Sequence, residues 1–255
     1  MTRVALLSDL HFGLHDPDLL SALARDVQAA TPDVVAGAGD LTNRGRPAEF
    51  EAAAVFLQSL CLPVVAVPDN HDIPGVHPMR LLDPFREWRR TFGAKTEPVW
   101  SEGRTALLGF NTVCRISGRL DWSAGVTDRA QLRRLGCRAA RFPGRRLLVL
   151  AHHPFRHPPQ DRLRAALGGA SAAVATFSAL GVSAVLSGHL HRPATLPAKD
   201  APDLILAGAA LCRRRPRGQP NAWILVQVGP DGVAATHRAW SNGRFAPWPP
   251  GGEEG

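Results

Sequence analysis

The 255-residue sequence contains little cysteine, and the few cysteines that it has are widely spaced. Cys61, Cys114, Cys137 and Cys212 form no Cys-x-x-Cys pair, which argues against both a zinc knuckle and a disulfide framework. Scattered thiols of this kind fit a reducing compartment.

Long apolar runs are also absent. No stretch reaches the length of about 18 apolar residues that a membrane-spanning helix requires, so the sequence predicts no membrane span. The apolar start at residues 4–7 is interrupted by Ser8 and Asp9, too early for the apolar region of a signal peptide. We therefore expect a cytoplasmic protein.

Lysine is scarce as well: of 30 basic residues only Lys95 and Lys199 are lysines, and the rest are arginines. The net charge of +8 is compatible with nucleic-acid binding, which relies on clustered basic side chains near phosphates. The chain is also rich in alanine, glycine and proline, which favours a compositional bias over a built basic surface. We interpret the densest cluster, at residues 213–217, as a solvated loop, and a nucleic-acid partner is the less favoured interpretation.

What the sequence does contain is a series of short apolar runs that end directly in polar residues. In chain order these runs cover residues 4–8, 34–37, 64–67, 147–151 and 182–186. Helix-like stretches at 18–30 and 47–60 separate the first three, and Pro47 fits the first turn of a helix. Alternation of strand, polar loop and helix predicts right-handed βαβ units and a largely parallel sheet.

The middle of the chain is expected to hold a charged helix at 84–92, a strand at 105–110 and a second helix that begins near Thr127. Beyond His191 the pattern changes to strands alone. They are expected at 203–207, 222–228 and 232–239, and the Gly-Pro-Asp-Gly turn at 229–232 predicts a hairpin between the last two.

These elements predict an α/β fold, in which a mixed β-sandwich is flanked by helices. We expect one domain over residues 1–244, because the length suits a single core and no shift of composition marks a second unit. The tail at 245–255 is rich in Pro, Gly and Glu and is expected to be disordered.

Metal-competent side chains follow the apolar runs at their carboxyl ends, which is where ligands bind in open α/β sheets. Asp9 and His11 are two residues apart, a spacing that in a strand places both side chains on one side. The other candidates are Asp40, Asn70, His152, His189 and His191. Carboxylate, imidazole and amide ligands suit manganese, iron or zinc and are poor for thiolate-preferring metals.

The order Asp-x-His, Gly-Asp, Asn-His-Asp, His and Gly-His-x-His resembles the calcineurin-like metallophosphoesterase superfamily. The segments SDLHFG, GDLTNRG and SGHLH look most like its class III cyclic-nucleotide phosphodiesterase branch, and the resemblance spans residues 8–191. It implies the four-layer αββα fold of that family and a binuclear, metal-dependent phosphoesterase.

The resemblance also implies two ligand sets. The first divalent metal ion would take Asp9, His11, Asp40 and His191, and the second would take Asp40, Asn70, His152 and His189. Asp40 would bridge the two ions, and a hydroxide held between them would attack the phosphorus atom. His152 is preferred over His153 because the family places its ligand two residues before a proline, here Pro154.

Further roles follow from the same resemblance. His71 matches the family histidine that protonates the departing alkoxide or stabilises its charge, and Asp72 is expected to orient the His71 ring as a hydrogen-bond acceptor. Asn43, Arg44 and His153 are candidates for contact with the substrate. A surface or capping role stays open for Arg44, and a loop-shaping role stays open for His153.

Asp69 departs from the family pattern, which usually has glycine before the Asn-His pair. Aspartate tolerates positive φ better than most residues, so we expect the fold to survive the change. The added carboxylate has three open interpretations. It weakens substrate binding, it tightens a metal, or it is solvated and without effect.

The expected substrate is a small phosphodiester, with a cyclic nucleotide as the specific hypothesis. The same metal core serves phosphomonoesterases and pyrophosphohydrolases of nucleotide-linked lipid precursors, and the motifs do not separate these activities. A nuclease and a non-catalytic scaffold are less favoured. The sequence leaves the oligomeric state open, a dimer included.

Overall fold

The computed structural model describes residues 1–75, 77–113, 125–161 and 166–249, in which the strands form two six-stranded sheets. In spatial order, the first sheet contains β12 (Arg244–Pro247), β11 (Gly232–Ser241), β10 (Ala222–Gly229), β1 (Thr2–Leu7), β2 (Val34–Ala38) and β3 (Val64–Val67). The second contains β4 (Val99–Glu102), β5 (Thr105–Gly109), β6 (Arg146–Leu150), β7 (Val182–Ser187), β9 (Asp203–Leu206) and β8 (Ala194–Leu196).

The sheets are mixed, with the parallel strands in one half of the first sheet and at the centre of the second. β1, β2 and β3 are parallel to one another, as are β5, β6, β7 and β9, whereas β10 runs antiparallel to β1. The predicted hairpin is confirmed, because β10 and β11 pair up to Gly229 and Gly232.

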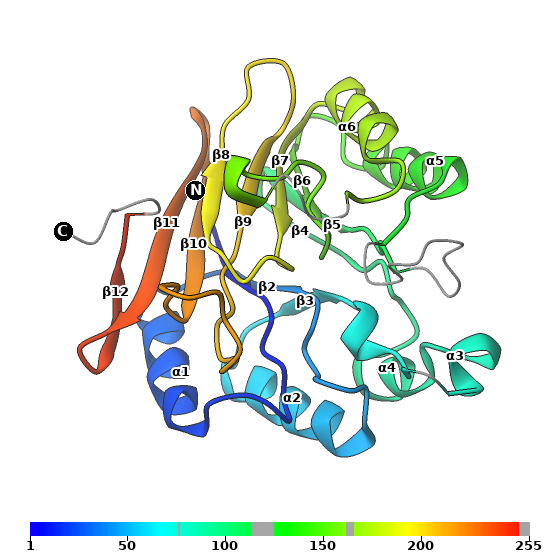
Figure 1. Ribbon diagram of the computed structural model, residues 1–255. Coiled ribbons are helices and arrows are strands. Elements are labelled where there is room, and N and C mark those ends of the chain that lie inside the picture. Colours follow the sequence, from blue (N-terminus) through cyan, green and yellow to red (C-terminus); the bar gives the residue numbers. More distant parts are fainter. Residues whose placement is uncertain (76, 114–124, 162–165, 250–255) are drawn as a thin grey trace.

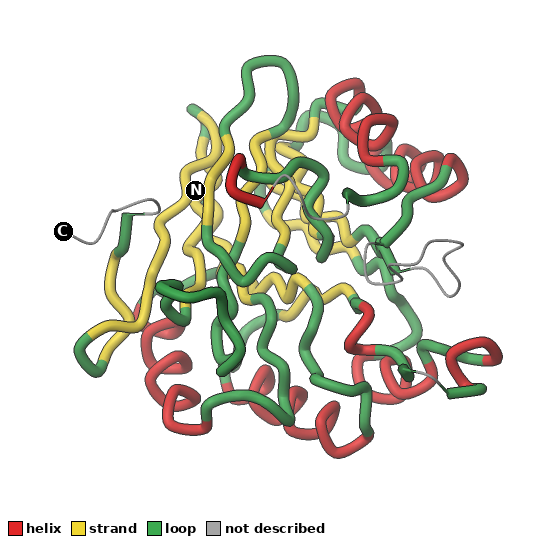
Figure 2. Tube along the Cα trace, in the orientation of Figure 1, coloured by secondary structure: helices red, strands yellow, loops and turns green. Residues whose placement is uncertain are grey.

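Helices cover the outer face of each sheet, so the molecule has four layers (Figure 1). On the first sheet lie α1 (Leu20–Ala29), α2 (Pro47–Ser59) and α4 (Arg86–Phe92), and on the second lie α5 (Arg129–Ala139) and α6 (Ala170–Ala179). Figure 2 shows these two groups of helices on opposite sides of the strands. The short elements are the helix α3 (Met79–Leu82) and the 3-10 turns at Pro17–Leu19, Asn70–Asp72 and Pro159–Asp161.

Three apolar cores hold the layers together. Leu23 and Phe50 pack in the core under the first helical layer, and Val149 and Phe177 pack in the core under the second. The core between the sheets is built from small and branched side chains such as those of Leu6, Leu148 and Ile224. Buried strands with apolar residues on both faces are what parallel sheets covered by helices require. The predicted α/β sandwich is confirmed.

Local capping explains where two helices begin. At α5 the Asp128 side chain accepts from the backbone N–H of Gln131 at 2.8 Å, and the Gln131 side chain accepts from the Asp128 N–H at 2.7 Å. This reciprocal pair satisfies two N–H groups that the first turn leaves open. At α2 the first helical residue is Pro47, as predicted.

The tail differs from its prediction. Residues 244–247 form β12, which pairs with β11 across a turn between Ser241 and Arg244. The strand forms because Phe245 is buried against Trp240, with ring centroids 5.3 Å apart. The disorder expected for residues 245–247 is therefore wrong, and residues 250–255 lie outside the described part of the chain. None of the helices in the described residues has both the length and the apolar character that a membrane crossing requires.

Candidate metal centre

The candidate site lies where the loops that follow β1, β2, β3, β6 and β7 leave the sheets. The first two loops stay side by side beyond the ends of their strands. The backbone N–H of Asp9 donates to the carbonyl of Gly39 at 3.2 Å, and that of His11 donates to the carbonyl of Asp40 at 2.9 Å. These backbone hydrogen bonds therefore join the loop that carries Asp9 and His11 to the loop that carries Asp40.

The backbone at the site adopts an unusual conformation. Five of the eight non-glycine residues with positive φ in the described ranges are predicted ligands: Asp9 (53°), His11 (46°), Asp40 (52°), His189 (74°) and His191 (51°). Such conformations store roughly 1 to 3 kcal/mol each and concentrate at functional sites. The strand-spacing argument for Asp9 and His11 is wrong, because β1 ends at Leu7 and both residues follow it in the left-handed region.

The structure brings together the four residues predicted for the first metal. One potential ligand atom from each of Asp9, His11, Asp40 and His191 lies within 4.8 Å of the others. His191 Nε2 is 3.1 Å from Asp9 Oδ1, and His11 Nε2 is 3.3 Å from His191 Nε2 and 3.4 Å from Asp40 Oδ2.

A second cluster adjoins the first. His152 Nε2 lies 3.2 Å from His189 Nδ1 and 3.7 Å from Asp40 Oδ2, so the Asp40 carboxylate stands between the two clusters. Asn70 is buried and lines the same cavity as Asp40 and His189. The group of potential ligands also contains Asp69, whose carboxylate lies with His152 and His189.

Hydrogen bonds from the far side of two rings fix which nitrogen faces the site. His152 Nδ1 is 2.6 Å from the carbonyl oxygen of Ala38, and His191 Nδ1 is 2.6 Å from that of Arg214. A carbonyl only accepts, so each Nδ1 carries the proton and each Nε2 presents a lone pair to the site.

The buried carboxylate oxygens at the site show whether these residues suit metal ions. Within the described residues, Asp9 Oδ1 and both carboxylate oxygens of Asp69 are buried without a hydrogen-bond partner. An unsatisfied buried carboxylate oxygen is costly, and a divalent cation satisfies it. The donor set of carboxylates and neutral imidazoles therefore fits two divalent ions.

The electrostatics of the site point the same way. Burial raises the pKa of Asp40 well above its usual value, and the charges of Asp69 and Asp9 raise it further. Burial lowers the pKa values of His11 and His152 to about 3, so both rings are neutral, as metal ligands must be. Bound cations would reduce the electrostatic repulsion among these buried carboxylates, which the neutral histidines do not offset.

Comparison with known proteins identifies the family. The family model described as calcineurin-like phosphoesterase matches residues 2–193. This chain belongs to the calcineurin-like phosphoesterase family. Membership makes it a metal-dependent phosphoester hydrolase that works with two divalent metal ions.

Two solved structures support the fold of this phosphoesterase. A dimetal phosphatase from Danio rerio is 13% identical with a TM-score of 0.67, and the match covers 93% of this chain and 96% of that one. Purple acid phosphatase PPD1 from yellow lupin is 13% identical with a TM-score of 0.69, and the match covers 96% of this chain and 52% of that one. No curated protein matches the sequence.

A cavity of about 140 Å³ opens on the metal cluster of the phosphoesterase. His71 lines it beside His11, with the two ring centroids 4.9 Å apart. The His71 ring is held from behind, because its Nδ1 is 2.6 Å from the carbonyl oxygen of Asn43. Asn43 also lines the cavity. The Asn43 carbonyl therefore engages Nδ1 of His71 and not Nε2.

The predicted contact between Asp72 and His71 is wrong. Asp72 Oδ1 accepts from the backbone N–H of Thr42 at 2.8 Å, and Oδ2 accepts from that of Asp69 at 3.0 Å. Its carboxylate is directed at the main chain of two neighbouring loops, and the Asn43 carbonyl takes the orienting role instead. Asp72 is a residue that holds loops together.

Arg44 and His153, two candidates for substrate contact, lie outside the cavity lining. Arg44 is exposed, and its backbone N–H donates to Glu49 Oε2 at 2.7 Å. His153 is 2% exposed, with Nδ1 2.8 Å from Thr112 Oγ1. Burial at this level contradicts direct contact between His153 and a substrate and favours the loop-shaping alternative.

Two residues at the site were not predicted. Arg214 is exposed, as expected for a solvated loop at residues 213–217, but it also lines the cavity. Cys212 is fully buried within 4.8 Å of potential ligand atoms of His11 and His191, and burial raises the pKa of its thiol to about 11. The loop that carries Cys212 and Arg214 reaches the site because it runs beside the end of β1. There the Ala210 N–H donates to the Ser8 carbonyl at 3.1 Å.

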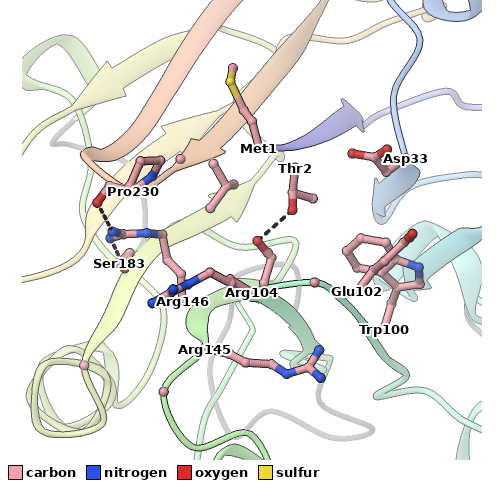
Figure 3. Close-up of a pocket in the computed structure, with 16 residues that line it drawn as sticks. Met1, Thr2, Asp33, Trp100, Glu102, Arg104, Arg145, Arg146, Ser183 and Pro230 are labelled. Carbon is pink, nitrogen blue, oxygen red and sulfur yellow. Dashed lines mark hydrogen bonds between the residues drawn. The ribbon is translucent and has the colours of Figure 1, made fainter.

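A larger cavity, of about 830 Å³, lies at the opposite edge of the sheets (Figure 3). Its lining includes Thr2, Thr105 and Arg146, which begin β1, β5 and β6. Arg146 donates there to Ser183 Oγ at 3.2 Å and to the Pro230 carbonyl at 2.9 Å. The clusters of metal-competent side chains found in the described residues all lie at the other edge, so the smaller cavity marks the chemistry.

Proposed function

We propose that this phosphoesterase hydrolyses small phosphodiesters in preference to phosphomonoesters. The observation that carries the proposal is the charge of the site, where three carboxylates, those of Asp9, Asp40 and Asp69, are buried together. A diester carries one negative charge, whereas a monoester carries about two near neutral pH, since its second pKa is about 6. A site with an extra carboxylate disfavours the more anionic ligand.

Two metal ions, when bound, would supply an activated water and neutralise charge on the phosphoryl group. The chain itself contributes two side chains to such a reaction. Arg214 lines the cavity and adds a positive charge for the anionic ester. His71, held through Nδ1 by Asn43, donates a proton from Nε2 to the departing alkoxide when the ring is protonated.

The cavity limits what the site itself recognises. A volume of about 140 Å³ accommodates a phosphate group and its nearest atoms, whereas pockets for whole drug-sized ligands measure roughly 300 to 1,000 Å³. The remainder of the substrate therefore extends beyond the cavity. A cyclic nucleotide is our specific hypothesis, supported by the likeness of SDLHFG, GDLTNRG and SGHLH to the cyclic-nucleotide branch.

We also propose a cytoplasmic location. Cys61 and Cys137 are free and exposed, and exposed thiols persist in reducing compartments.

Steady-state kinetics with Mn²⁺ test the substrate class. Bis(4-nitrophenyl) phosphate and 4-nitrophenyl phosphate share one leaving group, so a change in their kcat/KM ratio between wild type and a charge variant reports how that charge selects between diester and monoester. We expect the ratio to favour the diester, and to fall in Asp69→Gly, which restores the glycine of the family. Cyclic nucleotides form the third arm of the panel. An outright preference of the wild type for the monoester contradicts the proposal and leaves the metal centre intact.

A further inference from the structure

Asp69 follows β3 and is fully buried among histidines. Its Oδ2 is 3.4 Å from His152 Nε2, and its Oδ1 is 3.2 Å from His153 Nδ1. Of the three interpretations that the sequence left open, a solvated carboxylate is contradicted by this burial. Within the described residues neither of its oxygens meets a hydrogen-bond donor in good geometry.

The surrounding donors are arranged as ligands of one ion. Potential ligand atoms of Asp69, His152 and His189 all lie within 4.8 Å of one another. Two atoms that each lie about 2.0 to 2.2 Å from a zinc ion are at most about 4.4 Å apart, so this group closes on a cation after a small shift. The nitrogen of His152 that faces Asp69 is Nε2, which is also the one that its bond to Ala38 leaves free.

Gly39 makes room for this arrangement. A Cβ at Gly39 would lie 2.7 Å from His152 Nδ1 and 3.0 Å from Asp69 Cβ, and the φ of Gly39 is +79°. Only glycine fits both the backbone conformation and the close approach. The loop after β2 therefore passes directly over the pair formed by Asp69 and His152.

From this geometry we propose that the Asp69 carboxylate binds the second metal ion directly. It joins the ligands that the resemblance implied for this ion, Asp40, Asn70, His152 and His189. The second ion then has two anionic ligands in place of one, which strengthens its binding and suits hard dications such as Mn²⁺. The proposal concerns the metal centre and holds for either class of phosphate ester.

The competing role for Asp69 is that of a residue that contacts a metal ligand or its neighbour without binding the metal ion itself. In that role Asp69 accepts a hydrogen bond from His153 and acts on the metal only through the ring packing of His153 against His189, whose centroids are 4.6 Å apart. The two roles predict different effects for Asp69→Asn and His153→Phe. The first variant removes the charge of a ligand but keeps an oxygen acceptor, and the second removes the hydrogen bond but keeps an aromatic ring.

Metal binding separates these roles without any measurement of activity. Apoprotein is titrated with Mn²⁺ by calorimetry, and free Mn²⁺ is followed by electron paramagnetic resonance. We expect Asp69→Asn to weaken the second site by roughly 10-fold or more, a loss at least as large as outer-shell changes produce, while the first site keeps its affinity. His153→Phe should stay within about threefold of wild type, below the loss of about 10- to 100-fold that removal of an outer partner produces.

Asp26→Asn is the matched control. Asp26 accepts from Trp223 Nε1 at 2.9 Å and from Arg238 Nε at 2.7 Å, away from the metal centre. The Asp26→Asn variant makes the same chemical change at a partly buried aspartate, and it should leave the affinities of both metal sites unchanged. Wild-type affinity in Asp69→Asn overturns the proposal, and so do equal losses in Asp69→Asn and His153→Phe.

A crystal structure of the zinc-loaded wild type tests the same proposal without any variant, in case the variants fold poorly. Anomalous scattering places the ions, and we expect an oxygen of Asp69 at about 2.0 to 2.2 Å from one of them. Two located ions with no Asp69 oxygen in coordination contact overturn the proposal.

Discussion

The backbone N–H of His189 donates to Asp9 Oδ2 at 3.1 Å and so joins two loops that are far apart in the chain. The same oxygen accepts from Ser8 Oγ at 2.6 Å, whereas Asp9 Oδ1 faces His191 Nε2 at 3.1 Å. One oxygen of this carboxylate therefore holds the loop and the other is left for a metal.

Gly188→Ala tests this junction. A Cβ at Gly188 would lie 1.8 Å from Ser8 Oγ and 2.7 Å from Asp9 Oδ2, so the loop that carries His189 and His191 must move away. We expect affinity for Mn²⁺ to fall by roughly 10-fold or more, as for other changes that misplace ligands, in a calorimetric titration.

Gly136→Ala serves as the control for that variant. Gly136 lies inside α5, where a Cβ meets no atom within 4 Å. The change should stabilise the helix by about 0.5 to 1 kcal/mol and leave metal binding unchanged. Wild-type Mn²⁺ affinity in Gly188→Ala would show that the close approach of the two loops is not needed.

His71→Ala should separate chemistry from metal binding. The His71 ring lines the cavity, is held by the Asn43 carbonyl and belongs to neither metal cluster. We expect the variant to keep its metals and to lose rate by roughly 10² to 10⁴ on an ester with a basic alkoxide leaving group. The loss should be smaller for 4-nitrophenolate, which departs without a proton. Equal losses on both esters assign His71 to positioning of the substrate.

His237 predicts a pH dependence of stability that is independent of the metals. Burial lowers its pKa from 6.5 to about 4 in the folded protein. Between these values the unfolded chain binds the additional proton, so the stability from neutral His237 is present above pH 6.5 and is lost as the pH falls toward 4. Wild type should lose up to about 3 kcal/mol more than His237→Gln over this range.

Urea unfolding of the metal-free proteins at a series of pH values measures this difference. Gln is chosen because it can still pair with Thr195 Oγ1, which lies 2.8 Å from His237 Nε2. Unfolding free energies that stay parallel for the two proteins from pH 7 to pH 4 contradict the account.

Substitutions of Asp40 and Asn70 should lower the metal content of the protein to different extents. Asp40 Oδ2 is 3.4 Å from His11 Nε2 in one cluster and 3.7 Å from His152 Nε2 in the other, whereas Asn70 was assigned to the second ion alone. Asp40→Asn should therefore lower the occupancy of both sites, and Asn70→Ala that of one. Elemental analysis after Mn²⁺ loading measures both. Equal losses argue that Asp40 does not bridge the ions.

Much of the fold was predictable because strand, polar loop and helix alternate in the first half of the chain. β3 matches its predicted run, and α2 begins at Pro47 as expected. The edge strand β8 was missed, since its three residues carry too little pattern. β12 was missed because proline and glycine around it resemble a disordered tail, and its pairing with β11 and the burial of Phe245 both depend on the fold.

The site was predictable as a set of residues and less so as geometry. The ordered motifs gave residues that the structure gathers at one edge, but strand spacing did not foresee the left-handed backbone at Asp9 and His11. Cys212 and Arg214 reach the site through a distant loop, and no local pattern signals that contact. Asp69 stood out as a departure from the family pattern, yet its burial beside His152 required the fold.

The central claim is that this chain holds two divalent ions at the carboxyl edge of its sheets. Elemental analysis of the wild type, loaded with Mn²⁺ and freed of unbound metal by gel filtration, tests it most directly. The account predicts a content that approaches two metal ions per chain. A content near zero in protein that is folded by circular dichroism contradicts it.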